Sequence, residues 1–455
     1  MNHSTLTPPA LPVTKHHEIL ALVAIFLGVG LSAIDTAIAN TALPAIAADL
    51  HAPAAASIWI INTYQIAIVA ALLPLAALGD LWGPRRIFIG GLALFTAASL
   101  ACALATTLPM LALVRALQGL GAAGVMSVNI ALIRLLYPPS RLGRGVGLNA
   151  LVVGIGFTLG PAVASLVLSV ATWPWLFAIN VPLGLLALAF AWSALPRSVR
   201  RGHGFDPLTA VLTSCTFAGL ILALSSAAQR EALPFVLLPL SIAMVSGLFL
   251  VRRQAGHPAP MLPVDLLRRP MFALSTVTAI ASFAAQALAF VSLPFYFEEV
   301  LHRNPIDTGF LMTAWSILVA LIAPIAGRMS DRHPPGLLGG CGLSVLALGM
   351  LSLAFLPSEP DTWDLVIRLA ICGAGFGFFQ SPNLKALMSS APPERSGGAS
   401  GVIGMARLIG QTTGAALVAL CFSLAGVHGS TWALGLGSVC AGLAATASFA
   451  RLWAR

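Results

Sequence analysis

Long apolar runs recur along the whole chain and set the strongest limit on how it can fold. Each is about as long as the ~20 residues that a helix needs to cross the hydrocarbon core of a bilayer. Only 9% of the 455 residues are charged, whereas soluble domains have about 25%. We therefore predict an all-α integral membrane protein with fourteen spans, at about residues 19–43, 58–78, 87–107, 109–136, 146–170, 175–195, 208–228, 233–251, 271–297, 308–327, 337–356, 364–388, 400–425 and 431–451.

The basic residues predict the orientation of these spans. If the N-terminus is cytoplasmic, nineteen of the 24 Lys and Arg residues fall in cytoplasmic loops and tails, as the positive-inside rule requires. The net charge of +9 follows this loop pattern, so it does not indicate a nucleic-acid partner. We predict a multi-pass protein of the inner membrane, embedded in the lipid bilayer, with both termini in the cytoplasm.

The chain shows no sequence pattern for a cofactor or a catalytic centre. None of the six cysteines forms a CxxC pair, and the nine histidines have no metal-ligand spacing. A GxxxxGK[ST] loop, which would hold ATP, is absent from the sequence. We predict no metal, no cofactor and no enzymatic activity.

The sequence repeats itself with a shift of eight spans. Asp80 ends the second span and Asp331 ends the tenth, 251 residues later. Arg115, near the start of the fourth span, has its counterpart Arg368 253 residues later. Repeated halves around a central site are usual in secondary transporters. The predicted organisation is an N-terminal tail (1–18), a six-helix bundle (19–195), loops with two inserted spans (196–270), a second six-helix bundle (271–451) and a C-terminal tail (452–455).

Five stretches resemble motifs of the major facilitator superfamily, in particular its fourteen-span drug:proton antiporter branch. The departures are Ala76, where the first motif usually has a glycine, and Ala164 and Ser165, where the third commonly has two. The resemblance implies the major facilitator fold and proton-coupled export by alternating access. The stretches are ALGDLWGPRR (77–86), LALVRALQGLGAA (111–123), GFTLGPAVAS (156–165), WPWLFAINVPLG (173–184) and AIDTAIANTALP (33–44).

Asp35 lies deep inside the first predicted span, where a carboxylate is costly. Counting 1.5 Å per residue, Asp35 and Arg115 both lie about 8 Å below the outer membrane edge, which predicts that they pair. A static buried pair is one interpretation. The other is a proton site whose affinity changes as it opens to either side. The resemblance implies the second, with Asp35 as the proton or cation site and Arg115 as its coupling partner.

Two further sets of residues are expected to control the conformation. At the cytoplasmic face, the resemblance implies a charge cluster that latches the outward-open state, although for Arg85 and Arg86 a loop that only sets topology is an equal alternative. Small residues in the fifth span allow close helix contact and bending, and the resemblance adds a gating hinge that limits proton leak. The latch residues are Asp80, Gly83, Arg85, Arg86, Arg134 and Asp331, and the hinge residues are Gly160 and Pro161.

Polar residues inside the spans are candidates for a substrate cavity. Arg407 has no acid at its depth in any predicted span, and it can face the cavity, bind carbonyl groups or bind lipid phosphate. Gln118 extends the polar patch around Arg115 or packs helices together. The cavity candidates are Gln118, Gln286, Gln380, Asn383 and Arg407.

The expected function is export of small amphipathic compounds, cationic ones included, in exchange for protons. One alternative keeps the fold but carries a single endogenous metabolite. A second, less favoured, is a membrane sensor that transports nothing. The sequence leaves open the identity of the small-molecule substrate and the participation of a periplasmic adaptor.

Overall fold

A computed structural model describes residues 15–137, 142–196, 206–228, 232–254, 264–357, 359–390 and 396–453. Within these residues, fourteen helical segments are long and apolar enough to cross a membrane. The predicted number of spans is therefore confirmed.

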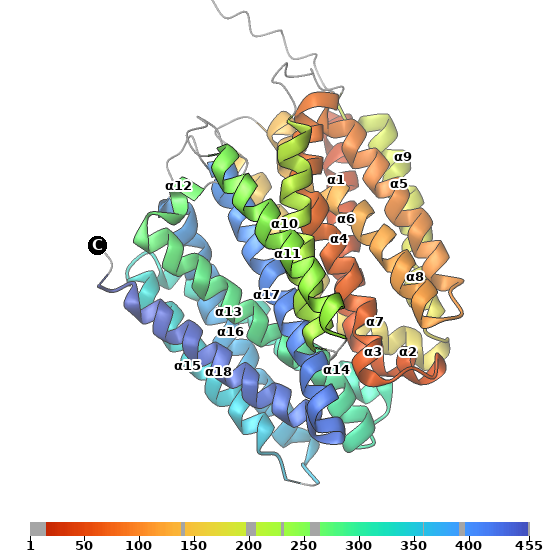
Figure 1. Cartoon of the computed structure of the whole chain (residues 1–455), viewed down its shortest axis with the longest axis vertical. Coiled ribbons are helices and arrows are strands. Elements are labelled where there is room, and N and C mark those ends of the chain that lie inside the picture. Colours follow the sequence, from red (N-terminus) through yellow and green to blue (C-terminus); the bar gives the residue numbers. More distant parts are fainter. Residues whose placement is uncertain are drawn as a thin grey trace, which may run out of the picture.

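The first bundle is built from the N-terminal helices (Figure 1). Its pairs are α1 with α7 and α9, α6 with α4 and α5, and α5 with α9. Two short helices, α2 (Leu43–Asp49) and α3 (Ala54–Ser57), join α1 to α4. The long helices are α1 (Lys15–Thr41), α4 (Trp59–Trp82), α5 (Pro84–Ala103), α6 (Leu108–Leu136) and α7 (Leu142–Val170), followed by the sixth span, α8 (Pro174–Ala178) with α9 (Asn180–Ala194).

The second bundle repeats the pairings of the first. α13 packs on α17 and α18, α16 on α14 and α15, and α15 on α18, so each pair named above has its counterpart. The helices are α13 (Pro270–Phe295) with the π-helix η2 (Tyr296–Val300), α14 (Pro305–Met329), α15 (Pro335–Ala354), α16 (Thr362–Ser390), α17 (Ser396–Ala425), the short 3₁₀ helix η4 (Gly426–His428) and α18 (Gly429–Ala450).

The two inserted spans lie between the bundles in the sequence and against both of them in space. α10 (Pro207–Ala228) and α11 (Leu233–Gln254) pack on each other, and α10 also contacts α4 of the first bundle and α17 of the second. They stand in front of the junction in Figure 1, and the short α12 (Val264–Leu267) precedes α13.

The bundles share apolar clusters at one end and at mid-depth, where Val69 and Leu72 of α4 belong to the same buried cluster as Met405 and Leu408 of α17. We call the end that holds the start of α1 and the end of α4 the proximal face, and the end that holds α2 and α3 the distal face. In the distal half, Ile38 and Ile60 of the first bundle belong to the same buried cluster as Phe290 and Leu293 of the second.

Near the proximal face, the described residues of each bundle form a cluster of their own. Ile25, Phe88 and Leu132 belong to the first bundle's cluster. Phe272 and Leu387 belong to that of the second. Apolar burial is worth about 25 cal/mol per Å². Among the described residues it joins the bundles distally and at mid-depth, but not at the proximal ends.

Candidate functional site

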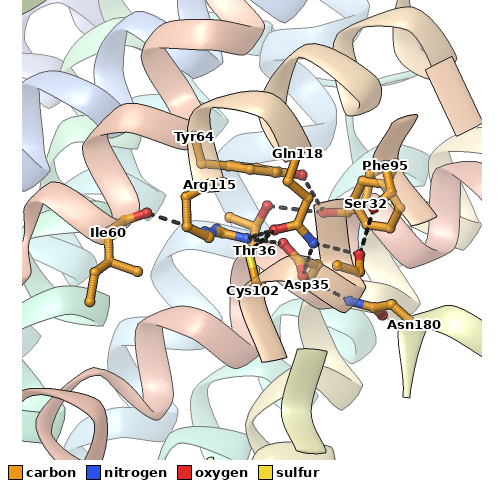
Figure 2. Close-up of polar contacts among 11 residues, drawn as sticks. Ser32, Asp35, Thr36, Ile60, Tyr64, Phe95, Cys102, Arg115, Gln118 and Asn180 are labelled. Carbon is orange, nitrogen blue, oxygen red and sulfur yellow. Dashed lines mark hydrogen bonds and ion pairs between the residues drawn. The ribbon is translucent and has the colours of Figure 1, made fainter. Parts of the chain in front are cut away.

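Asp35 sits in the middle of the first bundle and is almost completely buried, with 1% of its surface exposed. The Nη1 of Arg115, on α6, donates a hydrogen bond of 2.5 Å to its Oδ2, which makes this a buried ion pair (Figure 2). The contact expected from the matched depths of the two residues is present. Each charge makes the other tolerable inside a membrane span.

Two amide groups complete the shell around the carboxylate. Gln118 Nε2 and Asn180 Nδ2 each donate to Asp35 Oδ1, both at 2.9 Å (Figure 2). With Arg115 on Oδ2, all three partners are donors, and none accepts a hydrogen bond from the carboxyl group. Such a shell matches an ionised carboxylate, which is acceptor-only, and offers nothing to the O–H of a protonated one.

The guanidinium of Arg115 also makes several contacts besides the one to Asp35. Its Nε donates to the carbonyl of Ile60 at 3.2 Å, and Nη1 also reaches Gln118 Oε1 at 2.6 Å. The guanidinium carbon lies 4.1 Å from the ring centre of Tyr64 and 5.5 Å from that of Phe177, within the range of cation–π attraction. The site is thus a closed network that joins α1, α4, α6 and α9.

Asn180 is a site residue that the sequence analysis did not single out. It is the first residue of α9, just after the break between α8 and α9, and only 1% of its surface is exposed. Its Oδ1 is buried and has no hydrogen-bond partner among the described residues. The available signal was its place as the polar residue within WPWLFAINVPLG (173–184).

The predicted latch residues lie at the proximal face. Gly83 joins α4 to α5 with φ of +94°, a conformation that favours glycine. Arg85 Nη2 donates to the carbonyl of Trp192 at 2.5 Å, which fastens this turn to α9. Arg86 and Arg134 are exposed. The side chain of Asp80 lies outside what the structure describes.

In the second bundle, Asp331 meets a lysine from α16. Lys385 Nζ lies 2.5 Å from Asp331 Oδ1 and donates also to the carbonyl of Ser330. The neighbouring ammonium group, through its hydrogen bond first, holds the pKa of Asp331 below its usual value. Both side chains are well exposed, so solvent screens the pair.

The predicted hinge lies where α7 meets α1 and α14. A methyl group on Gly160 would overlap the Cβ of Ala37 on α1. The carbonyl of Pro161 accepts a hydrogen bond from Ser165 Oγ at 3.0 Å and lies against Gly309 of α14. Gly160 therefore lies at a close contact within the first bundle and Pro161 at a contact between the two bundles, where small side chains allow helices to come close.

A narrow cavity of about 30 Å³ lies at mid-depth between α1, α4, α6 and α7 on one side and α17 on the other. It can hold a few water molecules, whereas drug-sized ligands need pockets of several hundred Å³. Arg407 is among the lining residues. The polar lining groups are Ser32, Thr36, Tyr64, Gln65, Arg407 and Gln411, and the apolar ones are Val29, Ala33, Ile68, Met126, Val153, Phe157 and Leu408.

The other cavity candidates lie elsewhere. Gln118 belongs to the Asp35 network. Asn383 is buried near the proximal face, where its Oδ1 accepts from Nη1 of Arg451 at 2.7 Å and its Nδ2 donates to the carbonyl of Ser275. Gln286 and Gln380 are half-buried and do not line the described cavity.

Two repeated six-helix bundles with a cavity between them at mid-depth have the architecture of a secondary transporter. The Major Facilitator Superfamily model matches residues 25–415. The chain therefore belongs to the Major Facilitator Superfamily, and it is a multi-pass membrane transporter with the major facilitator fold.

Several proteins resemble the chain over most of its length. The transporter YebQ of Escherichia coli (strain K12) is 48% identical over 95% of both chains. Multidrug resistance protein Stp of Mycobacterium tuberculosis (strain CDC 1551 / Oshkosh) is 30% identical, over 88% of this chain and 75% of its own. Riboflavin transporter RibZ of Clostridioides difficile (strain 630) is 29% identical, over 83% of this chain and 82% of its own.

A solved structure shows the same fold at low sequence identity. It is a bacterial homologue of the human lysosomal transporter Spinster, with a TM-score of 0.68 and 16% identity. The match covers 96% of this chain and 97% of the other. It supports the arrangement of the helices.

Proposed function

We propose that the chain is a proton-coupled exporter of small amphipathic compounds that works by alternating access. We place it in the inner membrane with both termini and the proximal face in the cytoplasm, following the loop charges. The observation that carries the proposal is the closed shell of three donors around the buried carboxylate of Asp35. The likeness to a multidrug resistance protein supports export of small compounds.

Protonation of Asp35 would disturb this shell. A protonated carboxyl group gains an O–H donor and loses its charge. Its attraction for Arg115 then falls, and an arginine left without its counter-charge inside the bundle is costly. Since the network joins α1, α4, α6 and α9, adding a proton weakens the contacts that hold these helices together. We propose this step as the link between proton binding and conformational change.

Asn180 offers a partner for the protonated form. In the present arrangement its Oδ1 is buried and accepts no hydrogen bond from the residues that the structure describes. If its amide group rotates, the same residue changes from a donor to an acceptor and can receive the carboxyl O–H. One side chain would then serve both protonation states, which reduces the cost of moving between them.

The shared distal core supports assignment of the structure to the state that is closed to the outside. Apolar burial joins the bundles distally, and the described proximal clusters are separate. Rocking about the central cavity would open the distal contacts and close the proximal ends. We propose that Gly160 and Pro161 act as a hinge in this motion, and that the proximal charges, Asp80 with Arg85, Arg86 and Arg134, latch its other end state.

A dedicated exporter of one endogenous compound is the second candidate. It is favoured by the likeness to a protein named as a riboflavin transporter, over 83% of the chain. The two candidates share the fold and the proton site and differ in the breadth of the cargo.

The test uses everted membrane vesicles with an acidic interior. A panel of dyes, biocides, antibiotics and flavins is added outside, and proton release is followed for the wild type and Asp35→Asn. Asparagine keeps an oxygen that can accept from Arg115, so the variant should fold. We expect release by several unrelated compounds and its loss in the variant; release by one compound class alone would favour the dedicated exporter.

The matched control is Asp364→Asn, which removes the acid that pairs with Arg368 in the second bundle. We expect this variant to release protons as the wild type does. Full activity of Asp35→Asn would remove Asp35 from the coupling role, and equal loss in both variants would show a general effect of removing an acid.

A further inference from the structure

Arg407 brings a positive charge to the cavity that the Asp35 network does not use. It is the only charged residue among those that line the described cavity. Among the residues that the structure describes, it has no hydrogen bond or ion pair, and its Nε is buried without a partner. A guanidinium group has five N–H donors and strongly prefers to have them bonded.

The carboxylate of Asp35 does not compensate this charge. Asp35 is not among the lining residues, and its oxygens already take three donors, one of them the cation of Arg115. Tyr64 stands between the two sites, because it lines the cavity and also lies 4.1 Å from the Arg115 guanidinium. The described walls of the cavity are therefore positive, and a bound anion would offset that charge.

The groups around Arg407 suit the rest of such a ligand. Gln65 and Gln411 bring amide groups to the same cavity, and the Oε1 of Gln65 is already occupied by the hydroxyl of Thr412. The hydroxyls of Ser32, Thr36 and Tyr64 donate to backbone carbonyls or lie beside them. Phe157 and Met126 supply apolar wall. The cavity thus pairs a cation with apolar surface.

From this geometry we infer that the cargo is an amphipathic organic anion, whose carboxylate or similar acidic group binds the guanidinium of Arg407. The cavity of about 30 Å³ takes only that group, and the apolar part of the cargo enters when alternating access widens the cavity. The inference rests on the proposed export function and specifies the charge of its substrate. It departs from the cationic cargo that the sequence suggested. A cationic compound would meet Arg407 in the described cavity and no lining carboxylate.

The experiment compares ligands that differ only in charge. The full-length protein is placed in phosphatidylcholine nanodiscs, and affinities are taken from the ligand-dependent rise in unfolding temperature. One set is 2-naphthoate, its primary amide and 2-naphthylmethylamine; the other is 4-phenylbutyrate, its amide and 4-phenylbutylamine. We expect at least one carboxylate to bind about tenfold more tightly than its own amide. If neither does, the inference is overturned.

Substitutions of Arg407 test whether this residue causes the preference for the carboxylate. In Arg407→Gln, the carboxylate and the amide should bind within about twofold of each other. Arg407→Lys should keep a weaker preference, since it keeps the charge without the planar fork. Arg368→Gln is the control, because Arg368 is bound to Asp364 on its own helix. If Arg407→Gln keeps the wild-type preference for the carboxylate over the amide, the inference is overturned. If Arg407→Gln does not fold, a preference in Arg407→Lys weaker than that of the wild type provides the test.

A lipid headgroup could supply the same acidic chemistry. The measurement is therefore repeated with phosphatidylglycerol in the nanodiscs. An unchanged preference for the carboxylate supports cargo binding. A fall to the level of Arg407→Gln would mean that the headgroup takes the site and would overturn the inference.

The two proposals can fail separately. Proton release that depends on Asp35 but is evoked only by amines would leave the export function standing and sink the anionic cargo. Binding of carboxylates through Arg407 without any proton release would support an anionic ligand and contradict proton-coupled export.

Discussion

Arg115 and Arg368 hold equivalent places in the two bundles, and their surroundings differ. Arg115 is 1% exposed and binds a carboxylate on another helix. Arg368 is 24% exposed, and its Nε binds Asp364, four residues earlier on the same helix, at 2.9 Å. Its Nη1 donates to the carbonyl of Ser352. The first arginine joins a carboxylate on another helix across the bundle, whereas the second pairs with an acid of its own helix and reaches only a backbone carbonyl of α15.

The neighbours of the second arginine explain the difference. With the offset of 251 residues, Gln286 stands where the first half has Asp35, and with the offset of 253, Ile371 stands where it has Gln118. The repeated half therefore lacks the acid and the amide that build the network. The helix pairings are the same in both halves.

The difference between the two arginines separates the movement of the bundles, which both halves share, from coupling to an ion. The shared pairings give two bodies of similar shape, which suits rocking about a central cavity. Among the described residues, the buried ion pair occurs in the first body only, whereas the second holds Arg451, 2% exposed, without an acid. Coupling to an ion would therefore fall to the first half. The predictions below test that division, starting with the largest expected effect.

Removing Arg115 should damage the protein far more than removing Arg368. Arg115→Gln leaves Asp35 as a buried charge without its cation, a change that typically costs about 3–5 kcal/mol. Arg368→Gln breaks a partly exposed pair within one helix and a hydrogen bond to a carbonyl of α15, and it should cost about 1–2 kcal/mol. The free energy of unfolding in detergent micelles, measured by denaturant titration, compares the two.

The double variant Asp35→Asn/Arg115→Gln sharpens this result. It removes both charges, so it should regain part of the lost stability while transport stays abolished. If Arg115→Gln and Arg368→Gln lowered the free energy of unfolding equally, burial of the Asp35–Arg115 pair would not increase the cost of losing its cation.

Two close helix contacts, one in each half, should respond differently to the same methyl group. In the first half, a Cβ on Gly160 of α7 meets the Cβ of Ala37 on α1. In the second half, a Cβ on Gly410 of α17 meets the backbone carbonyl of Ile280 on α13. Each Gly→Ala substitution should destabilise by about 1–3 kcal/mol through overpacking.

Only the contact of Gly160 with Ala37 can be relieved by a second substitution on the partner helix. In Gly160→Ala/Ala37→Gly the methyl group changes helices, and stability should return to within about 1 kcal/mol, the propensity cost of the new glycine. Gly410→Ala/Ile280→Gly should show no such recovery, because the obstacle is a main-chain oxygen. Thermal unfolding of the four variants measures both effects, and recovery in the second half would contradict the described packing.

The smallest effect is expected at the exposed pair of Asp331 and Lys385. Asp331→Asn should leave stability unchanged at neutral pH, because solvent screens this pair. If the pair contributes to the latch, turnover should slow by less than about fivefold. Initial transport rates at saturating substrate measure the turnover of Asp331→Asn. A complete loss of transport would place a coupling group in the second half.

The acid dependence of the Asp331→Asn effect has a defined sign. Lys385 lowers the pKa of Asp331 in the folded protein. Its contribution is therefore present at neutral pH and is lost only as the pH falls through that lowered value. Wild type and variant should converge in acid, and a difference that grows in acid would contradict the assignment.

Much of the fold follows from the sequence because membrane spans are long and uniform. The bilayer sets the length of each apolar run, and the repeat places counterparts such as Asp80 and Asp331 at a constant offset. Depth along a span also follows from residue counting. That is why the contact between Asp35 and Arg115 could be predicted before the helices were placed.

The rotation of each helix about its own axis could not be predicted in this way. A span that is apolar all round carries little periodicity to tell which side faces the bundle. Asn180, Tyr64, Gln65 and Gln411 face the network or the cavity only because of packing between distant helices. For the same reason Asn383, expected at the cavity, is held by Arg451 near the proximal face.

The donor shell of Asp35 also bears on ion selectivity. Metal cations such as sodium are bound in proteins by several oxygen atoms, often including backbone carbonyls of broken helices. The groups that touch this carboxylate are N–H groups of Arg115, Gln118 and Asn180. A metal cation entering the network would face their hydrogen atoms, whereas a proton needs only one carboxylate oxygen. We therefore expect a site built in this way to favour H⁺ over Na⁺, so that the sodium gradient would contribute no driving force through it.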